Sequence, residues 1–164
     1  MRFYLLFLLF VSLPFFSAAQ INPAYYDSFC TTLGLALSSV ERDVPDSLLL
    51  PVPPAHFLGN GKMAVNRQLP GGTRMDSIEW QKGKIIFQSV LLSFELQPEA
   101  RLKIYSYLKN LLTACLPEWR LSESRPSAQT QVPVLTLSSS SQKIQATLTA
   151  EMHQQVTQFK LRVE

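Results

Sequence analysis

The sequence predicts an α+β two-layer sandwich, in which an antiparallel sheet of about five or six strands carries two main helices, about 23–40 and 98–116, on one face. Both segments have the apolar spacing of amphipathic helices. Residues 144–152 and 157–163 alternate apolar and polar side chains, as strands with one buried and one wet face do. Helices and strands do not alternate strictly along the chain, which disfavours a parallel doubly wound sheet.

Residues 1–19 have the layout of a secretory signal peptide. Arg2 supplies the positive charge, residues 3–16 form an almost unbroken apolar run, and Ser17 and Ala19 place small residues at a cleavage site. The alternative is an uncleaved membrane anchor, for which the apolar run is slightly short of the roughly 20 residues that a span needs. We therefore expect the leader to be removed.

Ala19-Gln20 after a leader rich in Phe and Leu resembles the signal peptides of bacterial envelope proteins, and this resemblance covers the leader alone. It implies export to the periplasm or the extracellular space. We expect residues 20–164 to form a single globular domain, because a chain of this length is normally one domain.

The charge balance argues against a nucleic-acid partner. The chain has 15 basic and 12 acidic residues, and Arg2 is the only charged residue of the leader. The small remaining excess is scattered, with Lys82 and Lys84 in a turn, and indicates a solvated surface. The expected partner is instead a protein, peptide or lipid of the envelope.

Cys30 and Cys115 are the two cysteines of the chain, and both lie in the exported part. Two thiols that enter an oxidising compartment are expected to form a disulfide, for which the chain-entropy model gives about 4–5 kcal/mol at this loop length. The alternatives are a catalytic thiol or a metal site. A metal would have to recruit His56 and His153, which lack the close spacing of zinc ligands. We predict no metal and no cofactor.

The first helix is expected to begin at Asn22-Pro23, because Asn is a favoured N-cap and Pro suits the first turn. Cys30 lies on or beside its apolar stripe, as Cys115 does on the second helix. The disulfide would therefore join two helices through their buried faces.

Residues 41–61 are predicted to form a long loop, because several prolines interrupt any helix or central strand there. Its apolar side chains make the loop a candidate binding surface; the residues concerned are Leu48, Leu49, Leu50 and Phe57. A plain packed connection is the alternative. Residues 62–67 can form a short strand.

The pair 82–83 (Lys-Gly) between two extended runs predicts a tight hairpin. This register pairs Trp80 with Ile85 and Ile78 with Phe87, so that all four side chains fall on one face. We therefore expect Trp80 to belong to the core.

The second helix starts at Pro98, which suits the first helical position, and ends before Pro117. Residues 118–131 are mostly polar and are predicted to form a loop. Trp119, at the start of this loop, is a further candidate for the binding surface, with core packing as the alternative.

Three strands are expected after the loop, within 132–137, 144–152 and 157–163. The serine run 138–141 serves as the exit turn of the first strand, and 153–155 reverses the chain between the last two. The three strands form an antiparallel meander.

No motif specifies an enzyme. Gly59-Asn60-Gly61-Lys62 lacks the spacing of a phosphate-binding loop, and G-x-S-x-G is absent. We therefore expect a small exported, non-enzymatic binding or interaction protein. One alternative is a small secreted hydrolase that uses His153 or His56 with an unidentified partner. The other is a subunit of a cell-envelope complex.

Overall fold

The computed structural model describes residues 22–44, 57–59, 62–65, 67–71, 76–140 and 143–164. Its two helices are α1, Pro23–Arg42, and α2, Pro98–Cys115. Its strands, in chain order, are β1 Phe57–Gly59, β2 Lys62–Ala64, β3 Ser77–Gln81, β4 Lys84–Glu95, β5 Arg120–Glu123, β6 Leu135–Ser138, β7 Gln145–His153 and β8 Val156–Val163.

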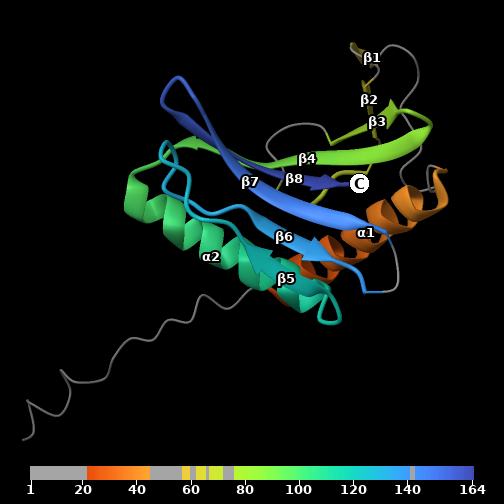
Figure 1. The fold of residues 1–164 in the computed structure, drawn as a ribbon, viewed down its shortest axis with the longest axis horizontal. Helices are drawn as coiled ribbons and strands as arrows, with labels where there is room; N and C mark the ends of the chain where they lie inside the picture. The colour runs from red at the N-terminus through yellow and green to blue at the C-terminus, as the bar shows by residue number, and fades with distance from the viewer. Residues whose placement is uncertain (1–21, 45–56, 60–61, 66, 72–75, 141–142) are drawn as a thin grey trace, which may run out of the picture.

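The described strands form one antiparallel sheet of 8 strands in the order β1-β2-β3-β4-β8-β7-β6-β5. Figure 1 shows both helices beneath this sheet, so the predicted α+β two-layer arrangement is confirmed. The longest strands, β4, β8 and β7, lie next to one another and form the centre of the sheet. Each helix packs its apolar stripe against their inner face.

The sheet has more strands than the five or six predicted, because two stretches predicted as loops contain short strands. β1 begins at Phe57, after the last proline of the 41–61 stretch, and pairs with β2. β5 lies within 118–131 and pairs with β6 along its whole length. Both are edge strands of three or four residues. Strands this short are at or below the four residues over which apolar alternation indicates a strand, so the sequence does not distinguish them from a loop.

The start of α1 is as predicted. The side chain of Asn22 accepts a hydrogen bond from the backbone N–H of Ala24 at 3.1 Å, and Pro23 occupies the first turn. The helix ends at Arg42, and the C-cap residue Asp43 has a positive φ of 52°, which stops the helix from continuing. Its buried face contains Phe29, Thr32, Leu33, Ala36, Leu37, Ser39 and Val40.

The β3–β4 hairpin has the predicted register, with Trp80 opposite Ile85 and Ile78 opposite Phe87. Both turn residues have positive φ, 51° at Lys82 and 79° at Gly83, as a type I′ turn requires. The prediction that Trp80 belongs to the core is wrong, because 41% of this residue is exposed. Trp80 lies at the end of the sheet, where α1 finishes over its partner Ile85 and leaves the larger indole uncovered.

The C-terminal strands alternate as predicted. In β8, Thr157, Phe159, Leu161 and Val163 are buried. In β7, Ala146 and Leu148 are buried, whereas Ala150 and Met152 are half-buried towards the end of the hairpin. The inner face of the sheet and the two helices thus enclose one apolar core.

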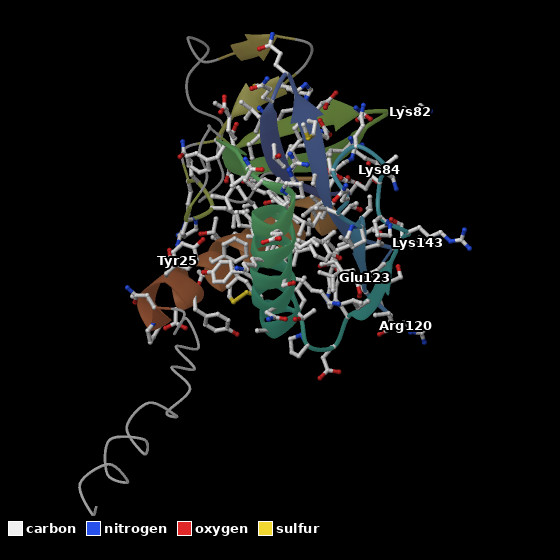
Figure 2. The ribbon with its side chains drawn as sticks, turned by 90° about the vertical axis from the view of Figure 1, so that its left-hand side faces the viewer. Tyr25, Lys82, Lys84, Arg120, Glu123 and Lys143 are labelled. Atoms are coloured by element: carbon white, nitrogen blue, oxygen red, sulfur yellow. A yellow bond between two sulfur atoms is a disulfide. The ribbon has the colours of Figure 1, made fainter. Side chains whose placement is uncertain are left out.

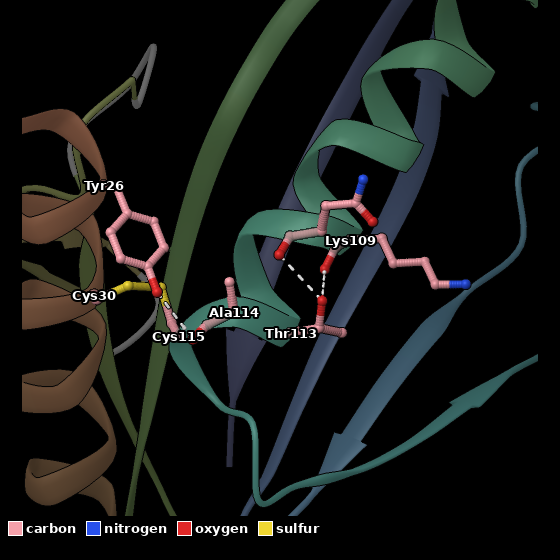
Figure 3. Close-up of a disulfide and its surroundings, with 7 residues drawn as sticks. Tyr26, Cys30, Lys109, Thr113, Ala114 and Cys115 are labelled. Carbon is pink, nitrogen blue, oxygen red and sulfur yellow. Dashed lines mark hydrogen bonds between the residues drawn. A yellow bond between two sulfur atoms is a disulfide. The ribbon is translucent and has the colours of Figure 1, made fainter. Parts of the chain in front are cut away.

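The predicted disulfide is present. Cys30 of α1 and Cys115 at the end of α2 are bonded, with their Cα atoms 5.1 Å apart and 85 positions apart in the sequence. Beside the bridge, the hydroxyl of Tyr26 donates a hydrogen bond of 3.0 Å to the carbonyl oxygen of Ala114, as Figure 3 shows. The two helices are therefore held together by a covalent and a polar contact at the same point.

Strand β5 is tied to α2 through Glu123. The hydroxyl of Tyr105 and the ammonium group of Lys109, the latter at 2.7 Å, both donate hydrogen bonds to the Glu123 carboxylate. The hydrogen bonds from Lys109 and Tyr105 lower the pKa of Glu123, and burial together with this carboxylate raises the pKa of Tyr105. These contacts hold an edge strand whose own side chains are all exposed.

Replacing Tyr105 with phenylalanine should lower the free energy of unfolding by about 1.5–3 kcal/mol, because one hydrogen bond to a charged carboxylate is lost. Tyr107→Phe is the matched control, since within the described part of the chain no hydrogen bond is recorded for the Tyr107 hydroxyl. Urea unfolding of both variants measures the difference. Equal losses would mean that the Tyr105–Glu123 contact contributes nothing beyond packing.

Candidate functional site

The face of the sheet opposite the helices, here called the open face, is the first candidate site. Because side chains alternate along a strand, the residues between the core positions all point to this side. The register aligns them in a transverse row that contains Ser77, Gln88, Arg162, Thr147, Thr136 and Ser122. Thr149, Lys160 and Glu151 extend the face along β7 and β8. A hollow of about 480 Å³ lies over its centre.

The charges of the open face are balanced. Lys62 donates a hydrogen bond of 2.9 Å to the side-chain oxygen of Gln88 and lies 3.8 Å from the Glu79 carboxylate. Arg162 forms an ion pair of 2.7 Å with Glu164. The surface therefore offers hydroxyl and amide groups for hydrogen bonding without the excess positive charge that binding to nucleic-acid phosphates requires.

Glu151 organises one end of the open face. Burial opposes its ionisation, but hydrogen bonds from Lys160 and His153 outweigh this effect and lower the pKa of Glu151. The ring nitrogen Nε2 of His153 lies 3.2 Å from this carboxylate, and 58% of the histidine side chain is exposed. A general base for a serine hydrolase would instead face a hydroxyl nucleophile. Of the two histidines predicted for a hydrolase, His153 thus contacts the Glu151 carboxylate, and His56 lies outside the described residues.

The binding-surface residues predicted from the sequence do not gather on the open face. Leu48, Leu49 and Leu50 lie outside the described residues. Phe57 opens strand β1 opposite Met63, at the edge of the sheet. Trp119 is half-buried and packs against the core beyond the end of α2. Binding at these positions stays a prediction.

The sequence indicated the outward residues of β7 and β8 through their alternation, but not the surface that they form. The row exists because β8 pairs with β4, which lies between 61 positions (Glu95 to Val156) and 76 positions (Phe87 to Val163) away in the chain. No local sequence pattern predicts that pairing. Within the ranges that the structure describes, no cluster of His, Cys, Asp and Glu could hold a metal ion. No described helix is long and apolar enough to span a membrane.

Comparison of the chain with protein-family models, with curated proteins and with solved structures finds no match.

Proposed function

We propose that this protein is a small exported, non-enzymatic binding protein that holds a polar segment of an envelope protein or peptide against its open face. The observation that carries the proposal is the transverse row of hydroxyl, amide and paired charged groups across the sheet. No described helix covers this face, and its hollow of about 480 Å³ is within the size range of ligand sites, roughly 300–1,000 Å³.

Two features support export. Residues 1–19 have the layout of a signal peptide, and the Cys30–Cys115 disulfide is of the kind that persists in oxidising compartments. The open face also suits binding better than catalysis. Its charged side chains are neutralised by one another, so they hold their geometry without an obvious reactive group.

Photo-crosslinking in the producing cell tests the proposal. A photoreactive amino acid at Thr149, on the open face, is expected to form an adduct with one partner, identified by mass spectrometry. The same amino acid at Ser106, exposed on α2, is the matched control and should form none. Equal adducts at both positions, or none at Thr149, would contradict the proposal.

A further inference from the structure

The edge of the sheet at β5 has backbone groups that no other described strand uses. β5 is the last strand in the order of the sheet, and all its residues are exposed. It pairs with β6 without a register shift, whereas β1, at the opposite edge, pairs with β2 through an irregularity. Proteins commonly protect an edge strand with a bulge, a proline or a covering segment. Among the described residues, the β5 edge has none of these.

The backbone groups that point away from the sheet follow from a neighbouring hydrogen bond. The N–H of Ser124 donates a hydrogen bond of 3.0 Å to the carbonyl oxygen of Val134, just before β6. In an antiparallel pair, every second residue exchanges hydrogen bonds with the neighbouring strand, so Ser122 also faces β6. The N–H and C=O groups of Leu121 and Glu123 therefore point out of the sheet.

This edge is held in position before any pairing. The Glu123 carboxylate accepts hydrogen bonds from Tyr105 and Lys109 of α2, and Figure 2 shows Arg120 of the same strand pointing away from the molecule. A second copy of the chain would offer a strand that is equally well formed. An unfolded segment of another protein would have to be ordered first, which costs free energy.

The outward groups of two copies match each other. In an antiparallel pair centred on Ser122, Leu121 of each copy lies opposite Glu123 of the other. These pairs form four hydrogen bonds, which use every N–H and C=O group that Leu121 and Glu123 direct outward. The pairing also places no like charges opposite each other, since Arg120 lies opposite Ser124.

The adjacent registers are less favourable. A pair centred on Leu121 would need the N–H of Trp119, which already donates a hydrogen bond of 3.1 Å to the carbonyl oxygen of Leu116. A pair centred on Glu123 would place two carboxylates directly opposite each other, which is destabilising. Hydrogen bonding and charge therefore select the register centred on Ser122.

We propose that two copies of this protein pair through their β5 strands in an antiparallel, two-fold arrangement centred on Ser122. Residues directly opposite in such a pair point to the same face, so the open faces of both copies lie on one side of a continuous sheet. Ser122 ends the transverse row of the open face, and the row continues into the second copy. The pairing does not depend on what the open face binds, so the two proposals can fail separately.

Sedimentation equilibrium of the oxidised protein, at up to about 1 mM because so small an interface is weak, tests the pairing. Leu121→Pro removes an outward N–H and leaves the hydrogen bonds between β5 and β6 in place, as prolines on edge strands do. Leu121→Val keeps the N–H and is the matched control. The parent and the valine variant should dimerise, and the proline variant should do so roughly tenfold more weakly, since two hydrogen bonds are lost. Unchanged urea unfolding midpoints verify that both variants fold.

Nuclear magnetic resonance of the parent tests the register without any variant. The amide resonances of Leu121 and Glu123 should shift as the protein concentration rises. An isotope-filtered NOE should connect the Hα atoms of Ser122 in the two copies, which face each other across a non-hydrogen-bonded pair.

Three results would overturn the proposal: a parent that stays monomeric at about 1 mM, equal dimerisation by Leu121→Pro, or shifts confined to other residues. A monomeric parent whose Leu121 and Glu123 amides shift only with an added synthetic peptide of residues 119–124 would also overturn it, because the edge would then bind a peptide instead of a second copy.

Discussion

Removing the Cys30–Cys115 disulfide is expected to lower the free energy of unfolding by about 2–5 kcal/mol, the usual cost for a native bridge in a small domain. A typical domain has only about 5–15 kcal/mol in total, so the loss would be a large share of the stability. The variant Cys30→Ala/Cys115→Ala makes the change permanently.

The effect is large because the bridge closes a long segment of chain. The cysteines are 85 positions apart, and the reduced, unfolded chain gains the conformational freedom that this link removes. The bridge also fixes the position of α1 on α2, since the cysteines lie beside the Tyr26–Ala114 hydrogen bond. Without the bridge, only noncovalent packing holds the two helices together.

Urea unfolding with and without reductant measures this contribution. The parent protein should lose stability when reductant is added, whereas the alanine variant should be insensitive to it, which controls for effects of the reductant itself. A parent whose unfolding midpoint stays the same after complete reduction would contradict the prediction. Alkylation of thiols in the unfolded protein verifies the redox state in each sample.

Features encoded by nearby residues could be predicted from the sequence. The hairpin register follows from residues 82–83 with the apolar pairs on either side, and both helices follow from their spacing and their prolines. The disulfide was predictable because the predicted oxidising compartment and the positions of both cysteines on the two helices indicated the same pair. The helix and hairpin signals lie within a few residues of the structure that they determine. The disulfide needs no local signal, because the chain has only two cysteines.

Features that depend on tertiary contacts without a local sequence pattern could not be predicted. Strand β5 forms because it pairs with β6 and because the Tyr105 hydroxyl donates a hydrogen bond to Glu123. The polar sequence around β5 predicts neither contact. The exposure of Trp80 depends on where α1 ends relative to β4. A hollow of about 670 Å³ at the end of the sheet likewise exists only because the strand order brings the start of β7 near the β3–β4 turn.

Replacing Asp76 with asparagine is expected to stabilise the protein above about pH 6, in contrast to most substitutions of buried residues. Asp76 is fully buried next to the start of β3. Its Oδ2 atom accepts a hydrogen bond of 2.5 Å from the backbone N–H of Leu69, while Oδ1 has no hydrogen-bond partner among the residues that the structure describes. Asparagine keeps an oxygen acceptor for Leu69 and removes the charge.

The pKa of Asp76 determines the sign and the size of the effect. Burial raises the pKa of Asp76 from 3.8 to about 6. The nearby Ser89 hydroxyl and the Leu69 N–H lower this pKa but do not outweigh burial. The Ser89 hydroxyl lies beside the carboxyl without the geometry of a hydrogen bond. The folded protein therefore holds the proton more tightly than the unfolded chain. The contribution of Asp76 to stability is complete below pH 3.8 and is lost as the pH rises to about 6. At 1.36 kcal/mol per pKa unit, the loss is on the order of 3 kcal/mol.

Urea unfolding across this pH range, in the parent and in Asp76→Asn, measures the difference. Glu123 and Glu151 have lowered pKa values and act in the opposite direction, because their contributions are lost as the pH falls. They are common to both proteins and cancel in the comparison.

The same substitution at exposed Asp27 controls for the removal of one carboxylate. The stability difference between Asp76→Asn and the parent should grow from pH 3.8 to about 6 and then stay constant. A difference that does not vary with pH would show that Asp76 ionises as readily in the folded protein as in the unfolded chain.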